Sequence, residues 1–301
     1  MEPIWGIDLG GTKIEGVILK SKDQPEVLHR LRIPTEASKG YAHIIGQVKL
    51  LVDQLKAESG LTPAYVGLGH PGTLDPNTGL IKNANTTALI GQPFDVDLQK
   101  AMGVPFRLAN DANCFAVAEA LMGAAPDVVL NAEVVFGVIM GTGVGGGVVV
   151  NGKVIQGRQG IGGEWGHNFL DASGGTCYCG KLGCVERLIA GPALERFYAQ
   201  ISGTELRLPE IVKRAEAGSD PFATQTMDRL IHFFGKAIAV VINIIDPDVI
   251  VIGGGVGNID LLYTTGVEEA KKHIFNSRID TQFVKPKLGD SAGVFGAALL
   301  K

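Results

Sequence analysis

One pattern decides the fold, and the sequence contains it twice: Gly6-Ile7-Asp8-Leu9-Gly10-Gly11-Thr12 and Gly137-Val138-Ile139-Met140-Gly141-Thr142-Gly143. In each copy an apolar run leads into a glycine turn, and a second β-branched run follows. β-branched runs favour strands and glycines favour tight turns, so each copy predicts a β-hairpin. The expected strands are Ile4 to Leu9 with Lys13 to Leu19, and Val134 to Met140 with Val148 to Val150. The repetition predicts two related domains that face one cleft.

The two glycine turns are candidate phosphate-binding segments. Backbone N–H groups in such turns form concave anion sites, and the hydroxyls of Thr12 and Thr142 would add donors. Two ordinary hairpins are the simpler alternative, but ordinary hairpins need fewer glycines than residues 141–147 contain. The second turn also fits the dinucleotide pattern G-x-G-x-x-G. That pattern requires a following helix, whereas Val148 to Val150 continues as a strand.

A histidine and three cysteines lie within one short, glycine-rich stretch: His167, Cys177, Cys179 and Cys184. One imidazole and three thiolates suit tetrahedral zinc, and four protein ligands would leave no position for substrate. The stretch therefore predicts a structural zinc loop. The alternative is a reduced surface loop without metal. The fourth cysteine, Cys114, lies in an apolar run and is expected to be a small buried hydrophobe.

The same stretch carries a family resemblance. Gly-Glu-Trp-Gly-His at residues 163–167, followed by Cys-X-Cys-Gly-X-X-Gly-Cys-X-Glu at 177–186, resembles the signature of the ROK family of bacterial sugar kinases and sugar-responsive repressors. The resemblance extends over nearly the whole chain. Residues 82–95 and 163–181 are most similar to members that phosphorylate fructose and also accept mannose.

The resemblance implies an α/β fold of the actin-like ATPase type, shared with hexokinases, in which two domains flank a cleft. The smaller domain would hold residues 1–117 and a C-terminal helix at about 286–301 that returns to it. The larger domain would hold residues 118–285, including the zinc loop. Helices are expected over Tyr41 to Ser59 and Asp228 to Ile245, where apolar residues recur at helical spacing.

The resemblance also assigns the nucleotide contacts. Asp8 would hold the Mg2+ of MgATP through water, because Mg2+ keeps most of its hydration shell. The phosphate contacts would be Gly10, Gly11, Thr12 and Lys13 in the first turn and Gly141, Thr142 and Gly143 in the second. A third turn, Gly253-Gly254-Gly255, follows the apolar run Val249 to Ile252 and would lie against the adenosine. A strand-to-helix turn without a ligand remains open for this segment.

Asp111 is the expected catalytic base. Phosphoryl transfer to a sugar hydroxyl needs a carboxylate that orients the hydroxyl and takes its proton. Asn110 and Asp111 precede a helical pattern from Cys114 to Met122, and both residue types are also preferred helix N-caps, which is the structural alternative. The resemblance favours catalysis, because the matching aspartate is the base in the family. Asn110 is expected beside it on the sugar.

Further sugar contacts follow from the resemblance. Glu164, His167 and Glu186 would bind sugar hydroxyls, with His167 using one ring nitrogen for zinc and the other for the sugar. Asn85 is a candidate for the same pocket, although its segment can be read as a hydrogen-bonded loop. Solvent-exposed loop charge is the alternative for the two glutamates. His70 stands where family members carry an apolar residue, and it is expected to be a satisfied core or loop histidine.

Bulk properties exclude several classes of partner. The 301 residues include 27 basic and 31 acidic residues, and no Lys/Arg cluster predicts a nucleic-acid partner. The apolar run from Ala237 to Ile252 is interrupted by Asn243 and Asp246, which argues against a membrane span. No export signal precedes the first hairpin, so we expect a cytoplasmic protein. Family members commonly form homodimers.

The expected activity is ATP-dependent phosphorylation of a free hexose at its 6-hydroxyl, with fructose, mannose or glucose as substrate. The alternative substrate is N-acetylglucosamine or N-acetylmannosamine. A non-catalytic sugar-binding regulator of the ROK type is the alternative from a different class. Such a repressor would carry a helix-turn-helix before the first hairpin, where this sequence has only Met1 to Pro3.

Overall fold

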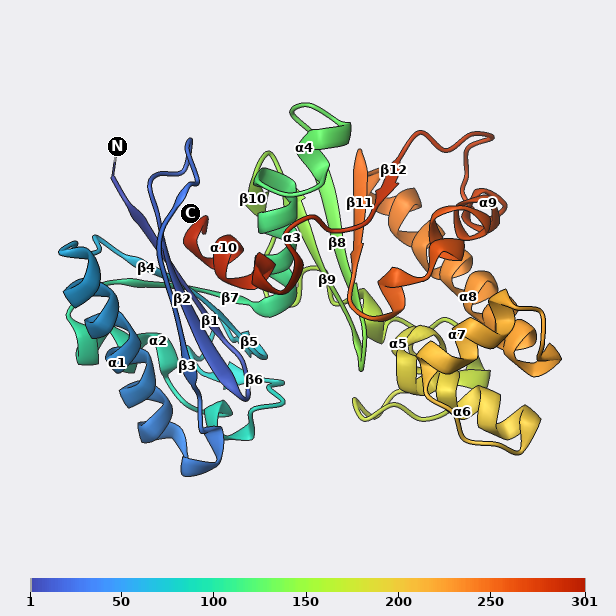
Figure 1. Cartoon of the computed structure of the whole chain (residues 1–301), viewed down its shortest axis with the longest axis horizontal. Coiled ribbons are helices and arrows are strands. Elements are labelled where there is room, and N and C mark those ends of the chain that lie inside the picture. The colour runs from blue at the N-terminus through green and yellow to red at the C-terminus, as the bar shows by residue number, and fades with distance from the viewer. Residues whose placement is uncertain (1, 301) are drawn as a thin grey trace. The chain divides into compact units, whose positions relative to one another are not determined.

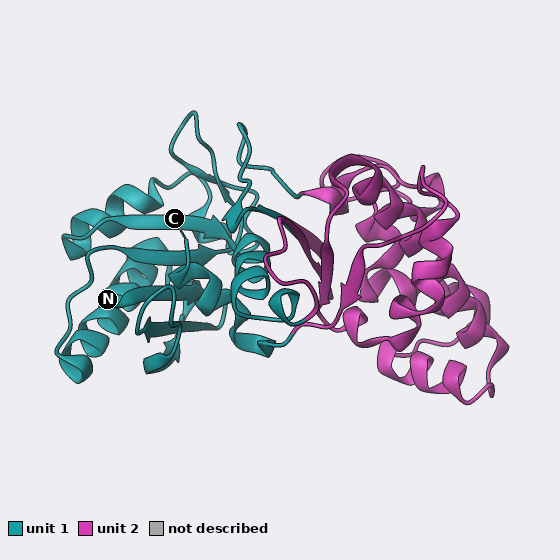
Figure 2. Cartoon of the chain, turned by 90° about the horizontal axis from the view of Figure 1, so that it is seen from above, with its two compact units in different colours: residues 1–127, 147–163, 287–301 teal, residues 128–146, 164–286 magenta. Residues whose placement is uncertain are grey.

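The computed structural model describes residues 2–300 and divides the chain into two compact units (Figures 1 and 2). The first unit holds the chain up to Asp127, residues 147–163 and the chain from Lys287 onward, and the second holds residues 128–146 and 164–286. This division differs from the predicted one at two places. The predicted boundary at residue 117 falls inside a continuous helix, and residues 147–163 belong to the first unit.

The first unit is built on a five-stranded sheet in the order β3-β2-β1-β4-β7. Its strands are β1 (Ile4–Leu9), β2 (Lys13–Leu19), β3 (Val27–Pro34), β4 (Val66–His70) and β7 (Phe106–Asn110). The predicted hairpin is formed by β1 and β2, and β4 and β7 then add in parallel. The other elements here are α1 (Tyr41–Ser59), β5 (Thr73–Leu74), β6 (Ile81–Lys82), α2 (Phe94–Met102), α3 (Asp111–Leu121), β10 (Lys153–Val154) and α10 (Ala292–Ala298).

Alternation along β1 separates the two faces of this sheet. Trp5, Ile7 and Leu9 join a buried core with residues of α1, while Gly6 and Asp8 face α10. Gly6 pairs in register with Gly67 of β4, and a Cβ on Gly67 would lie 1.8 Å from the carbonyl oxygen of Ala297. The two glycines therefore let the backbone of α10 lie directly on the sheet.

The second sheet repeats this strand order, as β10-β9-β8-β11-β12. Its further strands are β8 (Val134–Met140), β9 (Val144–Val150), β11 (Val249–Gly253) and β12 (Gln282–Val284). The remaining helices are α4 (Ala125–Val128), α5 (Glu186–Ile189), α6 (Gly191–Ser202), α7 (Leu208–Glu216), α8 (Pro221–Ile245) and α9 (Thr265–Lys271). In each sheet, the first three strands along the chain lie side by side in reverse order, and the last two strands follow next to the first strand. This shared topology agrees with the repeat in the sequence.

Three elements begin earlier than predicted, among them α3, which begins at Asp111 rather than at Cys114. Strand β9 starts at Val144, so Gly145 to Gly147 lie in a strand and not in a turn. A Cβ on Gly147 would lie 2.8 Å from the Cβ of Ala116, so this glycine serves close packing against α3. Helix α8 starts at Pro221 because Asp220 caps it, accepting hydrogen bonds from the backbone N–H groups of Phe222 and Ala223. Within residues 2–300, no helix is long and apolar enough to cross a membrane.

Candidate functional site

The first group of candidate residues lies where parallel strands of the first sheet end. Asp8 on β1 is in register with Gly69 on β4, which is in register with Ala109 on β7. Asn110 ends β7, and Asp111 begins α3. Carboxyl ends of parallel strands are the usual place for ligands in α/β sheets. The sheet topology thus brings Asp8, Asn110 and Asp111 to one edge.

Asn110, and not Asp111, caps helix α3. The side-chain oxygen of Asn110 accepts a hydrogen bond from the backbone N–H of Asn113 at 3.1 Å. Asp111 Oδ1 accepts the adjacent Ala112 N–H at 2.8 Å. The Asp111 side chain is exposed to solvent, yet the protein around its carboxyl partly desolvates it and raises its pKa above the usual value. The capping of α3 therefore does not require Asp111. The second carboxylate oxygen of Asp111, Oδ2, can accept a proton or a hydrogen bond from a substrate.

Asp8 lies in a crowded acidic environment. Its carboxylate packs against α10, where a Cβ on Gly293 would lie 2.8 Å from Oδ2. Burial, followed by the negative charges of Asp111 and Glu15, raises the pKa of Asp8 to about 6, against the smaller opposing effect of Lys13 and Arg32. Two carboxylates that repel each other in a partly desolvated place favour a bound cation. The residues present thus fit the Mg2+ that the family resemblance implies near Asp8.

The first glycine turn is a compact backbone structure. The N–H of Gly10 donates to the carbonyl of Lys13 at 3.0 Å, and Thr35 Oγ1 donates to the carbonyl of Gly10 at 2.6 Å. Gly11 and Thr12 are exposed. Asn85 is exposed as well, and its neighbour Thr86 lies on the Gly11 side of the turn, with Oγ1 3.9 Å from where a Cβ on Gly11 would be. The predicted Asn85 segment therefore adjoins the predicted phosphate turn.

The second unit brings the other two glycine turns together. The N–H of Gly141 donates to the carbonyl of Gly143 at 2.9 Å, which closes the turn between β8 and β9. Gly254 at the end of β11 has a φ of 80°, and a Cβ there would lie 2.3 Å from the carbonyl oxygen of Met140. The turn containing Thr142 and the turn at Gly253–Gly255 are therefore neighbours. The sequence did not reveal Gly191, whose N–H donates to the carbonyl of Gly141 at 2.8 Å.

Glu186 reaches the same turn from the side of the predicted zinc loop. Its Oε2 accepts the backbone N–H of Val144 at 3.0 Å, and a Cβ on Gly143 would lie 2.6 Å from that oxygen. Glu164 is half-buried before a single helical turn at Trp165–His167. Trp165 Nε1 donates to the carbonyl of Gly145 at 3.0 Å. Both glutamates thus belong to segments that pack on the hairpin of β8 and β9.

The four predicted metal ligands gather in space. One ligand atom from each of His167, Cys177, Cys179 and Cys184 lies within 4.8 Å of all the others. The Nδ1 atom of His167 lies 3.7 Å from Cys177 Sγ, and the sulfurs of Cys179 and Cys184 are 3.6 Å apart. A set of one imidazole and three thiol sulfurs at these separations fits a tetrahedral ion after small adjustments.

Tyr178, the variable position of the Cys-X-Cys motif, makes a contact that the motif did not predict. Its hydroxyl lies 3.0 Å from Nε2 of His167, whereas Nδ1 of the same ring is the nitrogen near the Cys177 sulfur. The two rings meet edge to face, with centroids 5.2 Å apart, and Tyr178 is largely exposed. Its position between two cysteine ligands was the available signal. Gly293, which makes room for Asp8, carried no comparable signal in the sequence.

His70 ends β4 in register with Asn110 and is buried. Its Nδ1 lies 3.0 Å from the carbonyl oxygen of Pro71, and its ring meets Phe94 edge-on. Burial lowers the pKa of His70 to about 4, so its imidazole is neutral at physiological pH. These contacts agree with the expected satisfied core histidine.

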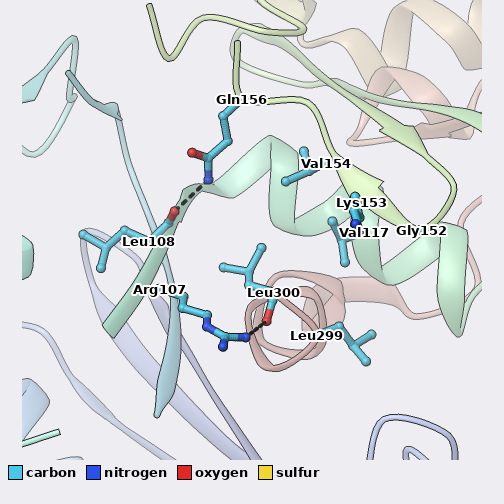
Figure 3. Close-up of a pocket in the computed structure, with 9 residues that line it drawn as sticks. All are labelled: Arg107, Leu108, Val117, Gly152, Lys153, Val154, Gln156, Leu299 and Leu300. Atoms are coloured by element: carbon cyan, nitrogen blue, oxygen red, sulfur yellow. Dashed lines mark hydrogen bonds between the residues drawn. The ribbon is translucent and has the colours of Figure 1, made fainter. Parts of the chain in front are cut away.

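The candidate residues thus form one group in each unit, and the structure also contains a cavity away from them. Asp8, Gly10, Gly11, Thr12, Lys13, Asn85, Asn110 and Asp111 belong to the first unit, and Gly141, Thr142, Gly143, Glu164, His167, Glu186 and Gly253–Gly255 belong to the second. The cavity, of about 300 Å³, lies in the first unit between Arg107 on β7, Lys153 on β10 and Leu299 beyond α10 (Figure 3). Arg107 donates there to the carbonyl of Leu300 at 3.0 Å.

Comparison with known proteins identifies the family. Residues 4–301 match the ROK family. The chain belongs to the ROK family. Among its relatives, the N-acetyl-D-glucosamine kinase of Aliivibrio salmonicida is 35% identical over 98% of both chains. The enzyme of the same name from Vibrio cholerae is 33% identical over the same shares.

Solved ROK structures confirm the predicted fold class. The ROK hexokinase of Thermus thermophilus has a TM-score of 0.88 and 33% identity, covering 99% of this chain and 97% of that one. A ROK glucokinase from Streptomyces griseus, in complex with glucose and AMPPNP, has a TM-score of 0.75 and 26% identity, covering 98% of each chain. The names of these ROK relatives are divided between an N-acetylated sugar and unmodified hexoses.

Proposed function

We propose that this ROK protein is an ATP-dependent sugar kinase that phosphorylates N-acetylglucosamine at its 6-hydroxyl. The observation that carries the kinase proposal is Asp111, an exposed carboxylate at the end of β7 beside a second carboxylate, Asp8, that favours a cation. Phosphoryl transfer requires a base for the hydroxyl and a cation for the phosphates. The sugar is proposed from the relatives that are 33% to 35% identical over nearly their whole length.

In this proposal Asp111 takes the proton of the sugar hydroxyl. Its Oδ1 is held by the Ala112 N–H, so the carboxylate has a fixed direction. Its pKa is raised by desolvation, which makes it a stronger base than a carboxylate in water. The Asn110 side chain uses its oxygen as the helix cap, and its amide N–H groups can donate to the sugar.

The glycine turns hold the nucleotide. Mg2+ bound near Asp8 would neutralise charge on the transferred phosphoryl group. The turns around Gly11 and Thr142 present backbone N–H groups and threonine hydroxyls to phosphates. The backbone at Gly254 packs closely on Met140, the last residue of β8, and this packing next to the second glycine turn supports an adenosine contact at Gly253–Gly255.

Glu164, His167 and Glu186 bind the sugar from the second unit. A zinc ion held by His167 and the three cysteines would order the loop that carries these groups. The close packing of the four ligands supports this role. Carboxylates that accept from vicinal hydroxyls discriminate among sugars, because a sugar without the hydroxyl leaves an acceptor unpaired.

An unmodified hexose is the second candidate substrate. The Thermus thermophilus structure, a ROK hexokinase with a TM-score of 0.88, favours it, as does the similarity of residues 82–95 to fructose-phosphorylating members. ADP release should be measured with N-acetylglucosamine, N-acetylmannosamine, glucose, mannose and fructose at matched enzyme concentration. We expect the highest kcat/KM with N-acetylglucosamine. A higher value with an unmodified hexose would contradict the sugar assignment, and ADP release with none of the five would contradict the kinase.

A further inference from the structure

A second cluster of metal-ligating side chains lies on the second unit, apart from the cysteine loop. His232 is on α8, Glu269 is on α9, and His273 follows α9. One ligand atom from each residue lies within 4.8 Å of the other two. Helices α8 and α9 lie side by side (Figure 1), so the cluster joins two packed elements.

One carboxylate oxygen organises the cluster. His232 Nδ1 and His273 Nε2 each lie 3.1 Å from Glu269 Oε1. Two ligands of a tetrahedral ion with bonds of about 2.0–2.2 Å are separated by about 3.4 Å, so these two separations need little change. Each imidazole thus has a nitrogen within hydrogen-bonding distance of this one oxygen.

The other carboxylate oxygen of Glu269, Oε2, contacts a lysine. Lys272 Nζ donates to Oε2 at 2.6 Å, which leaves Oε1 for the two imidazoles. A carboxylate ligand that is hydrogen-bonded through its second oxygen is the usual arrangement around protein metal ions.

The packing of the helices holds the carboxylate in place. A Cβ on Gly235 would lie 2.5 Å from Cγ of Glu269, so a larger residue at this position would displace Glu269. Gly235 lies on α8 one turn after His232, and the Glu269 side chain is only 14% exposed. His232 and His273 are 50% and 31% exposed, so solvent can supply a fourth ligand.

We propose that His232, Glu269 and His273 form a second metal site that binds a divalent transition ion such as Zn2+. Two imidazoles and one carboxylate suit Zn2+, Ni2+ or Cu2+ and disfavour Mg2+ and Ca2+, which prefer oxygen ligands. The ion would link α8 to α9 across their packed surface. The site is independent of the cysteine loop and of the proposed kinase activity.

The test is calorimetric titration of Zn2+ into the full chain, purified without chelator and dialysed against zinc-free buffer at pH 7.5. We expect the wild-type protein to bind one equivalent with a dissociation constant in the micromolar range. His232→Gln and His273→Gln should each weaken this binding at least tenfold, because each removes one of three ligands. The same titration with Mg2+ should give no binding at these concentrations.

His43→Gln is the matched control. His43 Nε2 also lies 2.9 Å from a glutamate, Glu36, but this pair has no second histidine, so zinc binding should be unchanged. A zinc-dependent rise in Tm should accompany binding in wild type and in His43→Gln, and it should be absent from the two cluster variants. Binding only at millimolar zinc, or binding that persists at full strength in both cluster variants, would overturn the proposal.

Discussion

Glu186 Oε2 accepts a hydrogen bond from the backbone N–H of Val144 at 3.0 Å. This contact joins the end of the cysteine loop to the glycine turn between β8 and β9. The sequence predicted a sugar contact for Glu186 and a phosphate contact for the turn as separate features. Through this hydrogen bond, a change at the side chain proposed to bind sugar can move the backbone proposed to bind phosphate.

Substitutions at Glu186 should separate these two roles. Glu186→Gln keeps an oxygen that can accept the Val144 N–H but loses the charge, so we expect KM for the sugar to rise about tenfold while KM for ATP changes less than about threefold. Glu186→Ala also leaves the Val144 N–H without its acceptor, and both KM values should rise. Steady-state kinetics with each substrate varied in turn will measure this. Equal effects of the two variants on KM for ATP would show that the hydrogen bond does not position the turn.

Asp111→Asn should lower kcat by a factor on the order of 10^2 to 10^4, because asparagine cannot accept the hydroxyl proton. The cap of α3 is supplied by Asn110, so the fold and MgATP affinity should stay close to wild type. Calorimetric nucleotide binding and thermal unfolding provide the controls. Retention of more than about a tenth of wild-type kcat would exclude Asp111 as the base.

The first hairpin, strand β8 and helix α1 could be predicted because local sequence determines them. Strands β1, β2 and β8 and helix α1 have the bounds that apolar patterning and glycine turns indicated. The role of Gly147 could not be predicted, because it depends on α3 packing against it, a contact between distant parts of the sequence. The start of α8 could also be predicted from the local sequence, because Asp220 is a typical helix N-cap and Pro221 is a typical first residue of a helix. Apolar spacing alone, which predicted a start at Asp228, does not detect such a cap.

In the candidate site, too, features set by local sequence could be predicted, and contacts between distant parts of the chain could not. The clustering of His167, Cys177, Cys179 and Cys184 could be predicted because these residues are close in sequence and chemically distinctive. The contacts of Glu186 with Val144 and of Asp8 with Gly293 could not, because each joins residues that only the fold brings together. The pKa of Asp8, raised by burial and neighbouring carboxylates, is likewise a property of the folded chain alone.

Cys179→Ser should reduce the zinc content from about one ion per chain and weaken sugar binding. Structural zinc supplies much of the local folding free energy, so the loop should become sensitive to proteolysis while α3 and the first sheet stay intact. Elemental analysis and limited proteolysis will test this. Cys114→Ala is the control, because Cys114 is buried in α3 outside the cluster and should leave the zinc content unchanged. Absence of zinc from wild-type protein purified without chelator would refute the metal site.

Asp8 should make stability depend on pH. Its pKa rises from 3.8 to about 6 on folding, so the folded state binds the proton more tightly than the unfolded chain. The resulting stabilisation is fully present below the unfolded pKa and is lost as pH rises through about 6. Without Mg2+ and nucleotide at pH 7.5, Asp8→Asn should therefore be more stable than wild type, by at most about 3 kcal/mol.

The Tm advantage of Asp8→Asn should shrink as pH falls from 7 to 4, because wild-type Asp8 then becomes protonated. Asp23→Asn, at an exposed carboxylate in the turn after β2, is the control. Kinase activity of Asp8→Asn should fall as its stability rises, since the proposed cation contact is lost. A Tm equal to or below wild type at pH 7.5 would contradict this account of Asp8.

Tyr178→Phe should tighten sugar binding. In the structure the Tyr178 hydroxyl is 3.0 Å from His167 Nε2, the nitrogen proposed to meet a sugar hydroxyl, so the sugar must displace this contact. One such hydrogen bond contributes about 0.5–1.5 kcal/mol, which corresponds to a roughly 2- to 10-fold lower Kd in the variant. Phenylalanine keeps the edge-to-face ring contact with His167, so the zinc content should not change. Calorimetric sugar titration decides between two roles for the hydroxyl: a lower Kd supports competition, whereas a higher Kd would show that Tyr178 itself binds the sugar.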